Sequence, residues 1–235
     1  MPTLPRPVLP RPVLPRPVLL LTRPEADARR MAATLPAPLA GLRRVISPVM
    51  RIVAVDHDAG ALRDAPGVVF TSAHAVAAAG PGAGRPAICV GARTAAAARA
   101  AGFEVTEGAG GAQDLLPLIA AARVPLIHAH GRHVAQALPL PGVVVYDQRP
   151  VAPTAEARAV LAGRAPVLLP VFSARSADLV SQVAAGVRAP LWVAAISDAA
   201  LAPLAGQAAR AAVACRPDGQ GVIAAMMQIV QQEQS

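Results

Sequence analysis

Short apolar runs alternate along the chain with Ala-rich stretches that are compatible with helix, and each run ends in a small or polar turn. The seven runs are residues 18–21, 68–70, 88–90, 126–127, 167–171, 191–195 and 211–215. Such runs, followed by helical segments, are typical of strands buried on both faces of a parallel sheet. The pattern therefore predicts an α/β protein.

Polar residues follow most of these predicted strands. They are Thr22-Arg23-Pro24, Thr71-Ser72, Gly91-Ala92-Arg93-Thr94, His130-Gly131-Arg132, Ser173 and Ser197-Asp198. Ligands of parallel α/β sheets bind at the carboxyl ends of the strands, so these segments should face one cleft. The cleft would offer hydroxyls, backbone amides and arginine, without an evident metal cage or nucleophile triad.

A faint internal duplication predicts two similar lobes. Residues 70–75 align with residues 171–176, and each segment follows an apolar strand and starts an Ala-rich helix. Residues 90–95 match residues 196–201 more weakly.

Two further segments look extended and neither leads at once into a helix. They are residues 44–55 and 143–153, which we interpret as a pair of crossover linkers between the lobes. The expected organisation is a tail over 1–17, a discontinuous first α/β lobe over 18–50 and 152–235, and a second α/β lobe over 51–151 with linker strands at its ends.

The basic residues of the chain are all arginine, because it contains 22 basic residues and no lysine. A lysine Schiff base and a Walker-type phosphate loop are therefore excluded. The net charge of +8 favours an acidic ligand. Nucleic acid fits less well, because aromatic residues make up only 2% of the chain and the arginines are scattered.

Both cysteines, Cys89 and Cys215, lie in apolar runs, so we expect buried thiols in a reducing, cytoplasmic compartment. The most apolar stretch, residues 189–209, contains two prolines and a glycine. It is better interpreted as strand, turn and helix than as a membrane span. We therefore expect a soluble protein with no membrane partner.

The N-terminal tail repeats a pentapeptide that starts at Leu4, Leu9 and Leu14. Its alternate prolines oppose helix and favour an extended polyproline conformation. We expect a disordered tail that arose by repeat expansion, the alternative being a ligand for a proline-binding domain.

Five short motifs occur in order between about Val18 and the C-terminus. They are Leu21-Thr22-Arg23-Pro24, Ser47-Pro48, Phe70-Thr71-Ser72-Ala73-His74-Ala75-Val76, Val90-Gly91-Ala92-Arg93-Thr94-Ala95 with Ala101-Gly102-Phe103, and Val145-Tyr146. Together they resemble the uroporphyrinogen-III synthase family.

The resemblance implies two Rossmann- or flavodoxin-like lobes joined by a two-stranded linker ladder, with the substrate between them. It also implies a cofactor-free lyase of heme biosynthesis. The reaction would cyclise hydroxymethylbilane, a linear tetrapyrrole with acetate and propionate side chains, with loss of water and inversion of ring D. Control of substrate shape would be the main task, and pre-organisation of this kind contributes up to roughly 7–11 kcal/mol.

The family places a tyrosine at the position of Tyr146, facing the cleft and assisting departure of the substrate hydroxyl. The alternative is a tyrosine ring that packs at the ladder. The expected substrate-binding residues are Arg23, Thr71, Ser72, Arg93, Thr94, His130, Ser173 and Ser197. Several of the hydroxyls among them, including that of Thr94, are also candidate helix N-caps.

The chain departs from the family pattern in two turns. Ser197-Asp198-Ala199-Ala200 stands where a Gly-x-Thr-Thr-like turn is usual, so Ala200 lacks a substrate-binding hydroxyl, a loss of about 0.5–1.5 kcal/mol. Asp198 would repel an anionic substrate unless it pairs with a cation such as Arg175, or it caps the next helix.

The second departure is His130-Gly131, which replaces an Arg-Gly pair. A protonated His130 would substitute as an anion contact. The spacing of His128, His130 and His133 suggests a metal site, but no carboxylate or cysteine lies nearby in the sequence, so we expect no metal.

Two other function classes remain open. The Gly-rich segment 108–111 would suit a flavodoxin-like nucleotide-binding protein, although a plain loop explains it too. A degenerate synthase would be a non-catalytic tetrapyrrole-binding or scaffold protein. Our leading interpretation is a monomeric synthase that binds a polycarboxylate tetrapyrrole and no nucleic acid.

Overall fold

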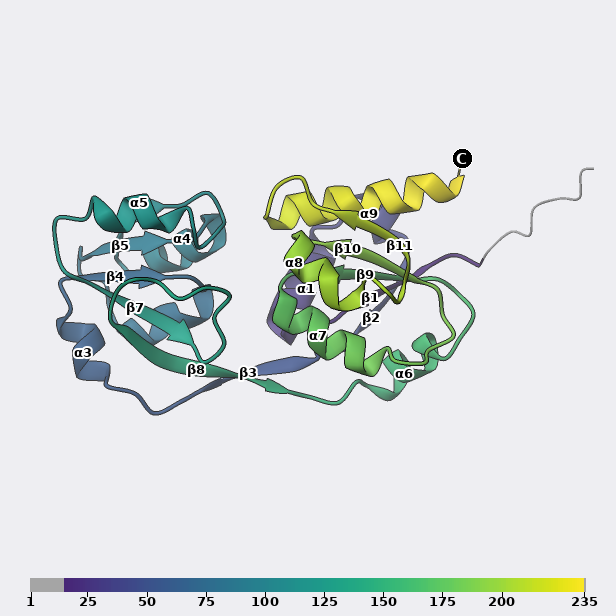
Figure 1. Cartoon of the computed structure of the whole chain (residues 1–235), viewed down its shortest axis with the longest axis horizontal. Coiled ribbons are helices and arrows are strands. Elements are labelled where there is room, and N and C mark those ends of the chain that lie inside the picture. Colours follow the sequence, from purple (N-terminus) through teal and green to yellow (C-terminus); the bar gives the residue numbers. More distant parts are fainter. Residues whose placement is uncertain (1–14, 235) are drawn as a thin grey trace, which may run out of the picture.

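Two sheets organise the part of the chain that the computed structural model describes, residues 15–234, with side chains to residue 232 (Figure 1). The first sheet has the order β11-β10-β9-β1-β2, and every neighbouring pair of strands is parallel. Its strands are β1 (Val18–Leu21), β2 (Arg43–Ile46), β9 (Val167–Val171), β10 (Leu191–Ala195) and β11 (Ala208–Val213). Most of the N-terminal repeat tail lies outside the described residues.

Helices cover both faces of this first sheet. They are α1 (Glu25–Ala33), α2 (Ala37–Ala40), α6 (Ala155–Leu161), α7 (Ala174–Val183), α8 (Asp198–Leu201), the 3-10 helix η2 (Ala202–Leu204) and α9 (Gly219–Gln234). Successive residues of β1 point to opposite faces: Leu19 and Leu21 join the core on the α1 and α9 side, and Val18 and Leu20 join the core with α6 and α7. A strand that is buried on both faces has a continuous apolar sequence, and for this reason the sequence pattern predicts β1.

The second sheet has six strands in the order β3-β8-β7-β4-β5-β6. The strands are β3 (Met50–Ala54), β4 (Gly67–Phe70), β5 (Pro86–Cys89), β6 (Glu104–Glu107), β7 (Leu126–Gly131) and β8 (Gly142–Pro150). The helices around it are α3 (Ala59–Asp64), the 3-10 helix η1 (Ala73–Ala79), α4 (Ala92–Ala100) and α5 (Leu115–Ala120). All strand pairs are parallel except β3 with β8.

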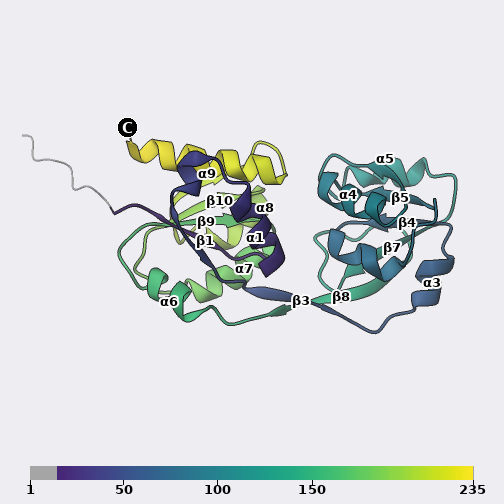
Figure 2. The same ribbon diagram turned by 180° about the vertical axis from the view of Figure 1, so that it is seen from behind.

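The β3–β8 pair connects the two lobes. Met50 pairs with Pro150 and Ala54 with Tyr146, so the two chain crossings run as one antiparallel ladder. Figures 1 and 2 show this ladder between the lobes from opposite sides. The predicted fold class, two parallel α/β lobes with a two-stranded linker ladder, is confirmed.

Each predicted apolar run contributes to a strand, but two strands were missed. β2 lies in the segment that we interpreted as linker, and β6 has the polar sequence Glu104–Glu107. Both are edge strands with several exposed residues, so neither produces an apolar run. Local hydrophobicity is therefore a poor guide to the edges of these sheets.

The expected burial is confirmed for one cysteine and wrong for the other. Cys89 ends β5 and is buried, whereas Cys215 is exposed. The apolar run 211–215 outlasts β11, which ends at Val213, so Cys215 lies beyond the sheet. Among the described residues, no helix is long and apolar enough to cross a membrane.

The position of β1 inside the sheet, between β9 and β2, makes Leu19 a test of the first core. Its side chain is fully buried beside residues of α9 such as Met226. We expect Leu19→Ala to lower the free energy of unfolding by about 2–5 kcal/mol, because it leaves a cavity. Urea denaturation measures this loss.

The control is Val134→Ala, whose side chain is 42% exposed and should change stability by no more than about 0.5 kcal/mol. Equal stabilities of the two variants would contradict the core position of Leu19.

Candidate functional site

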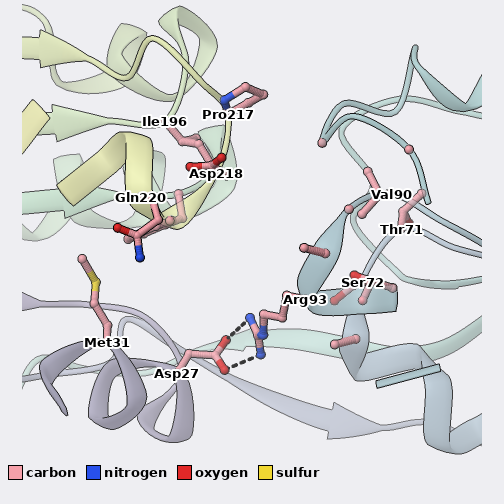
Figure 3. A pocket seen from close by; sticks show the side chains of 18 of the residues that line it. Asp27, Met31, Thr71, Ser72, Val90, Arg93, Ile196, Pro217, Asp218 and Gln220 are labelled. Atoms are coloured by element: carbon pink, nitrogen blue, oxygen red, sulfur yellow. Dashed lines mark hydrogen bonds and ion pairs between the residues drawn. The ribbon is translucent and has the colours of Figure 1, made fainter. Parts of the chain in front are cut away.

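A cavity of about 700 Å³ lies between the lobes. The first lobe lines it with one side of α1, with the turn before α9 at Pro217 and with the first turn of α9 at Gln220. The second lobe lines it with the turns that follow β4, β5 and β6. Figure 3 shows Asp27 and Met31 on one side and Ser72 and Arg93 on the other. The carboxyl ends of both parallel sheets thus supply the cavity wall, as the strand-end pattern predicts.

Five of the predicted site residues line this cavity: Arg23, Thr71, Ser72, Arg93 and Thr94. Thr94 is buried within α4, whose N-cap is Gly91, so its interpretation as an N-cap is wrong. Gly91 and Ala92 also line the cavity, which places the first turn of α4 at its wall.

Ser173 and Ser197 do not line the cavity but follow residues that do, Phe172 and Ile196. Each hydroxyl caps a helix: Ser173 accepts a hydrogen bond from the backbone N–H of Ser176, and Ser197 accepts one from that of Ala200. Their role as substrate contacts stays a prediction.

The altered turn in the first lobe has a structural explanation. Ser197, not Asp198, is the N-cap of α8, so the capping interpretation of Asp198 is wrong. Ala200 is fully buried in the core of the first lobe and does not line the cavity. A methyl group fits that core without an unpaired hydroxyl.

Thr71 has a buried partner behind the cavity wall. Its Oγ1 lies 2.9 Å from Nε2 of His128, on β7. Burial, assisted by the nearby His130, lowers the pKa of His128 to about 4. The imidazole is therefore neutral near pH 7 and holds the Thr71 hydroxyl by a neutral hydrogen bond. Sequence reasoning considered His128 only as a metal ligand.

His130 lies next to His128 on the same face of β7, with ring centroids 4.5 Å apart. Its Nδ1 is 2.8 Å from the Gly131 carbonyl oxygen, and it does not line the cavity. Its role as an anion contact stays a prediction. His133 lies instead near Asp147, and no group of three metal-ligating side chains occurs among the described residues.

Ser72 also has a buried partner, Tyr146. The Tyr146 side chain is only 6% exposed and does not line the cavity. Its hydroxyl lies close enough to the Ser72 side chain for a hydrogen bond to affect its pKa, and its ring makes an edge contact with His74. Burial raises the pKa of Tyr146 and the Ser72 hydrogen bond opposes this, so the phenol is neutral near pH 7.

The Gly131 backbone closes the space around this tyrosine. A Cβ at Gly131 would lie 2.5 Å from the Tyr146 ring, which leaves room for glycine only. Of the two predicted environments of Tyr146, the structure shows packing at the ladder; the prediction that this side chain faces the cleft is wrong, because it is buried in the core and does not line the cavity.

Asp27 is the residue of this site that sequence reasoning missed. Its carboxylate, on α1, is nearly buried and accepts two hydrogen bonds from Arg93 of the other lobe, at 2.9 and 2.5 Å (Figure 3). His74, also of the other lobe, lies 3.3 Å from it, and Arg23 lies 3.7 Å away. Arg30 pairs with it as well.

This environment keeps Asp27 charged. Burial alone would raise its pKa, but the hydrogen bond from His74 and the charges of Arg93 and Arg23 outweigh it and hold the pKa well below the usual value. Arg23 lies over the Phe172 ring at 3.9 Å. Burial is the main cause that lowers the pKa of Arg23 to about 10; the charge of Asp27 opposes it, and the charges of Arg93 and Arg30 add to it. Arg23 therefore remains a cation near pH 7.

Comparisons with known proteins agree with this architecture. The family model of uroporphyrinogen-III synthase HemD matches residues 36–224. The chain belongs to the uroporphyrinogen-III synthase family. Members of this family are enzymes of heme biosynthesis that act on a tetrapyrrole, and the resemblance found in the motifs is confirmed.

One solved structure, the uroporphyrinogen-III synthetase from Helicobacter pylori 26695, superposes with a TM-score of 0.59 at 11% identity. The match covers 91% of this chain and 99% of that one, so the two share the fold over almost their whole length. No curated protein matches the sequence significantly.

The buried histidine makes stability depend on pH. The pKa of His128 is about 4 in the folded protein and about 6.5 in the unfolded chain, so the unfolded state binds the proton first. Stability is therefore lost as the pH falls from about 6.5 towards 4. We expect His128→Gln, which keeps a hydrogen-bonding group but does not titrate, to lose less stability across this range.

Urea denaturation of both proteins at several pH values above 4 checks this expectation. Parallel stability profiles of wild type and His128→Gln would contradict it.

Proposed function

We propose that this protein binds hydroxymethylbilane in the cavity between its lobes and acts there as a hydro-lyase. It closes the macrocycle to uroporphyrinogen III, with inversion of ring D and loss of water. The observation that carries the proposal is the cavity wall itself, which combines arginines with hydroxyls and helix-terminal amides from both lobes. Its volume of about 700 Å³ suits a sizeable organic ligand.

The anionic side chains of the substrate require cations and N–H donors. Arg23 and Arg93 contribute guanidinium groups from opposite lobes, and the first turn of α4 contributes backbone amides at its positive end. Ser173 and Ser197 extend this surface beyond Phe172 and Ile196. Because residues of both lobes hold the carboxylates of the substrate, the substrate is fixed in a coiled shape. This shape favours closure with inversion over unaided cyclisation.

The hydroxyls of Thr71 and Ser72 supply neutral hydrogen bonds near the reacting end of the substrate. Each is oriented by a buried, neutral side chain, His128 or Tyr146. In our proposal the neutral phenol of Tyr146 positions the neighbouring Ser72 hydroxyl, and that hydroxyl donates to the departing hydroxyl of the substrate. This arrangement supports loss of water without a strong acid.

The two lobes that meet at the cavity are proposed as the functional domains, with boundaries at residues 50–51 and 151–152. We further propose that the enzyme works as a monomer, since one chain supplies both cavity walls. We also propose that it acts in the cytoplasm, without cofactor, metal or nucleic acid.

Product analysis tests the proposed activity. Freshly prepared hydroxymethylbilane is added to the purified protein, and the oxidised uroporphyrin isomers are separated chromatographically. We expect isomer III in excess over a protein-free control. Isomer I alone, from folded protein, would contradict the synthase reaction and favour a non-catalytic tetrapyrrole-binding protein.

Tyr146→Phe tests the path through Ser72. Loss of one neutral hydrogen bond costs about 0.5–1.5 kcal/mol, so we expect kcat for isomer III to fall about two- to tenfold with little change in KM. Ser72→Ala should cause a similar loss. If both groups act on one hydrogen bond, the double variant loses no more than the larger single effect.

Additive losses in the double variant would show that Tyr146 acts apart from Ser72. An unchanged kcat for Tyr146→Phe would remove its proposed role and leave the synthase reaction standing.

A further inference from the structure

The carboxylate of Asp27 pairs with Arg23 and Arg93, the two arginines that we propose bind the carboxylates of the substrate. Among the described acidic residues of the cavity wall, the other two, Glu107 and Asp218, pair with arginines of their own lobes, Arg99 and Arg216. Asp218 also caps α9 by accepting from the Gly221 N–H at 2.7 Å. Among these three acidic residues, only Asp27 forms ion pairs with residues of the other lobe.

The contacts of Asp27 are those of a bound carboxylate ligand. Arg93 grips both of its oxygens in a two-pronged hydrogen bond, the geometry in which arginine recognises carboxylates. His74, Arg23 and Arg30 complete the set of charged and titratable groups that face it. One carboxylate thus meets three arginines and a histidine, which leaves excess positive charge beside the cavity.

The same contacts join the lobes. Asp27 and Arg93 are 66 residues apart in the chain and lie on different lobes. Among the described residues, every ion pair between the lobes involves Asp27. The β3–β8 ladder fixes the lobes at one side only (Figure 1). Asp27 therefore links them at the side where the cavity lies (Figure 3).

We propose that in the ligand-free protein Asp27 holds the lobes together as an internal stand-in for a substrate carboxylate, and that a carboxylate of the ligand replaces it on Arg93 and Arg23. Asp27 is then a positioning residue that sets the affinity for polycarboxylates and the separation of the lobes. The identity of the natural ligand rests on the proposed function, whereas the linkage between the lobes does not.

Asp27→Asn tests both parts, with Glu25→Gln as the matched control. Glu25 lies on the same helix, and its pair with Arg29 is exposed and outside the cavity, so the control removes the same charge from α1. Small-angle X-ray scattering without ligand should give a larger radius of gyration for Asp27→Asn than for wild type and Glu25→Gln.

Calorimetric titration with a benzene tetracarboxylate measures the second part. Freeing charge-assisted hydrogen bonds should make Asp27→Asn bind this anion about ten- to a hundredfold more tightly than the control. A merely structural role of Asp27 predicts weaker binding. Unchanged or weaker binding, or an unchanged radius of gyration, would overturn the proposal.

Arg93→Met gives an independent test if Asp27→Asn does not fold. Because Arg93 is half-exposed, its replacement should preserve the core of the second lobe. It should enlarge the radius of gyration and weaken anion binding. Both measurements need no turnover, so a protein that passes them but forms no isomer III would contradict the proposed function and not this inference.

Discussion

The antiparallel pairing of β3 with β8 is the constraint on which the site depends. Each lobe is built on a largely parallel sheet whose polar turns gather at the carboxyl ends of its strands, and turns of both lobes line the cavity. The ladder connects the sheets so that the two sets face each other. It does so along one side, and on the cavity side the ion pair of Asp27 with Arg93 also joins the lobes.

Charge and neutrality are divided between two parts of the cavity wall. Arginines surround one buried carboxylate, while Thr71 and Ser72 are backed by an imidazole and a phenol that burial keeps neutral. Charged groups suit recognition of substrate carboxylates, and neutral hydroxyls suit the departure of a neutral leaving group. A cleft built this way depends on positioning more than on a strong acid or nucleophile.

The departures from the family pattern concern packing more than chemistry. Ala200 fills the core where a hydroxyl would lack a partner, and Ser197 retains the helix cap of that turn. His130 forms a hydrogen bond with the neighbouring Gly131 carbonyl, and its ring lies beside that of His128. None of the altered residues Ser197, Asp198, Ala200 and His130 lines the cavity, whereas Arg23, Thr71 and Arg93 do.

The sequence by itself determined the features that depend on local pattern. Buried strands such as β1 and β9 appear as apolar runs because both faces meet hydrophobic neighbours, and the polar strand ends that follow them include Arg23, Thr71 and Arg93. The pattern did not predict the edge strands β2 and β6, because one side of each lies open to solvent. The predicted burial of Cys215 was wrong, because the apolar run continues beyond the end of its strand.

Only the tertiary structure decided which of these residues meet. Asp27 lies in an ordinary first helical turn, where an acidic residue is expected for the helix dipole, and nothing near it in the chain indicates its partners on the other lobe. The buried partners His128 and Tyr146 likewise reach Thr71 and Ser72 from distant strands. Burial and charge pairing are properties of assembled surfaces, so they emerge when the two lobes are brought face to face.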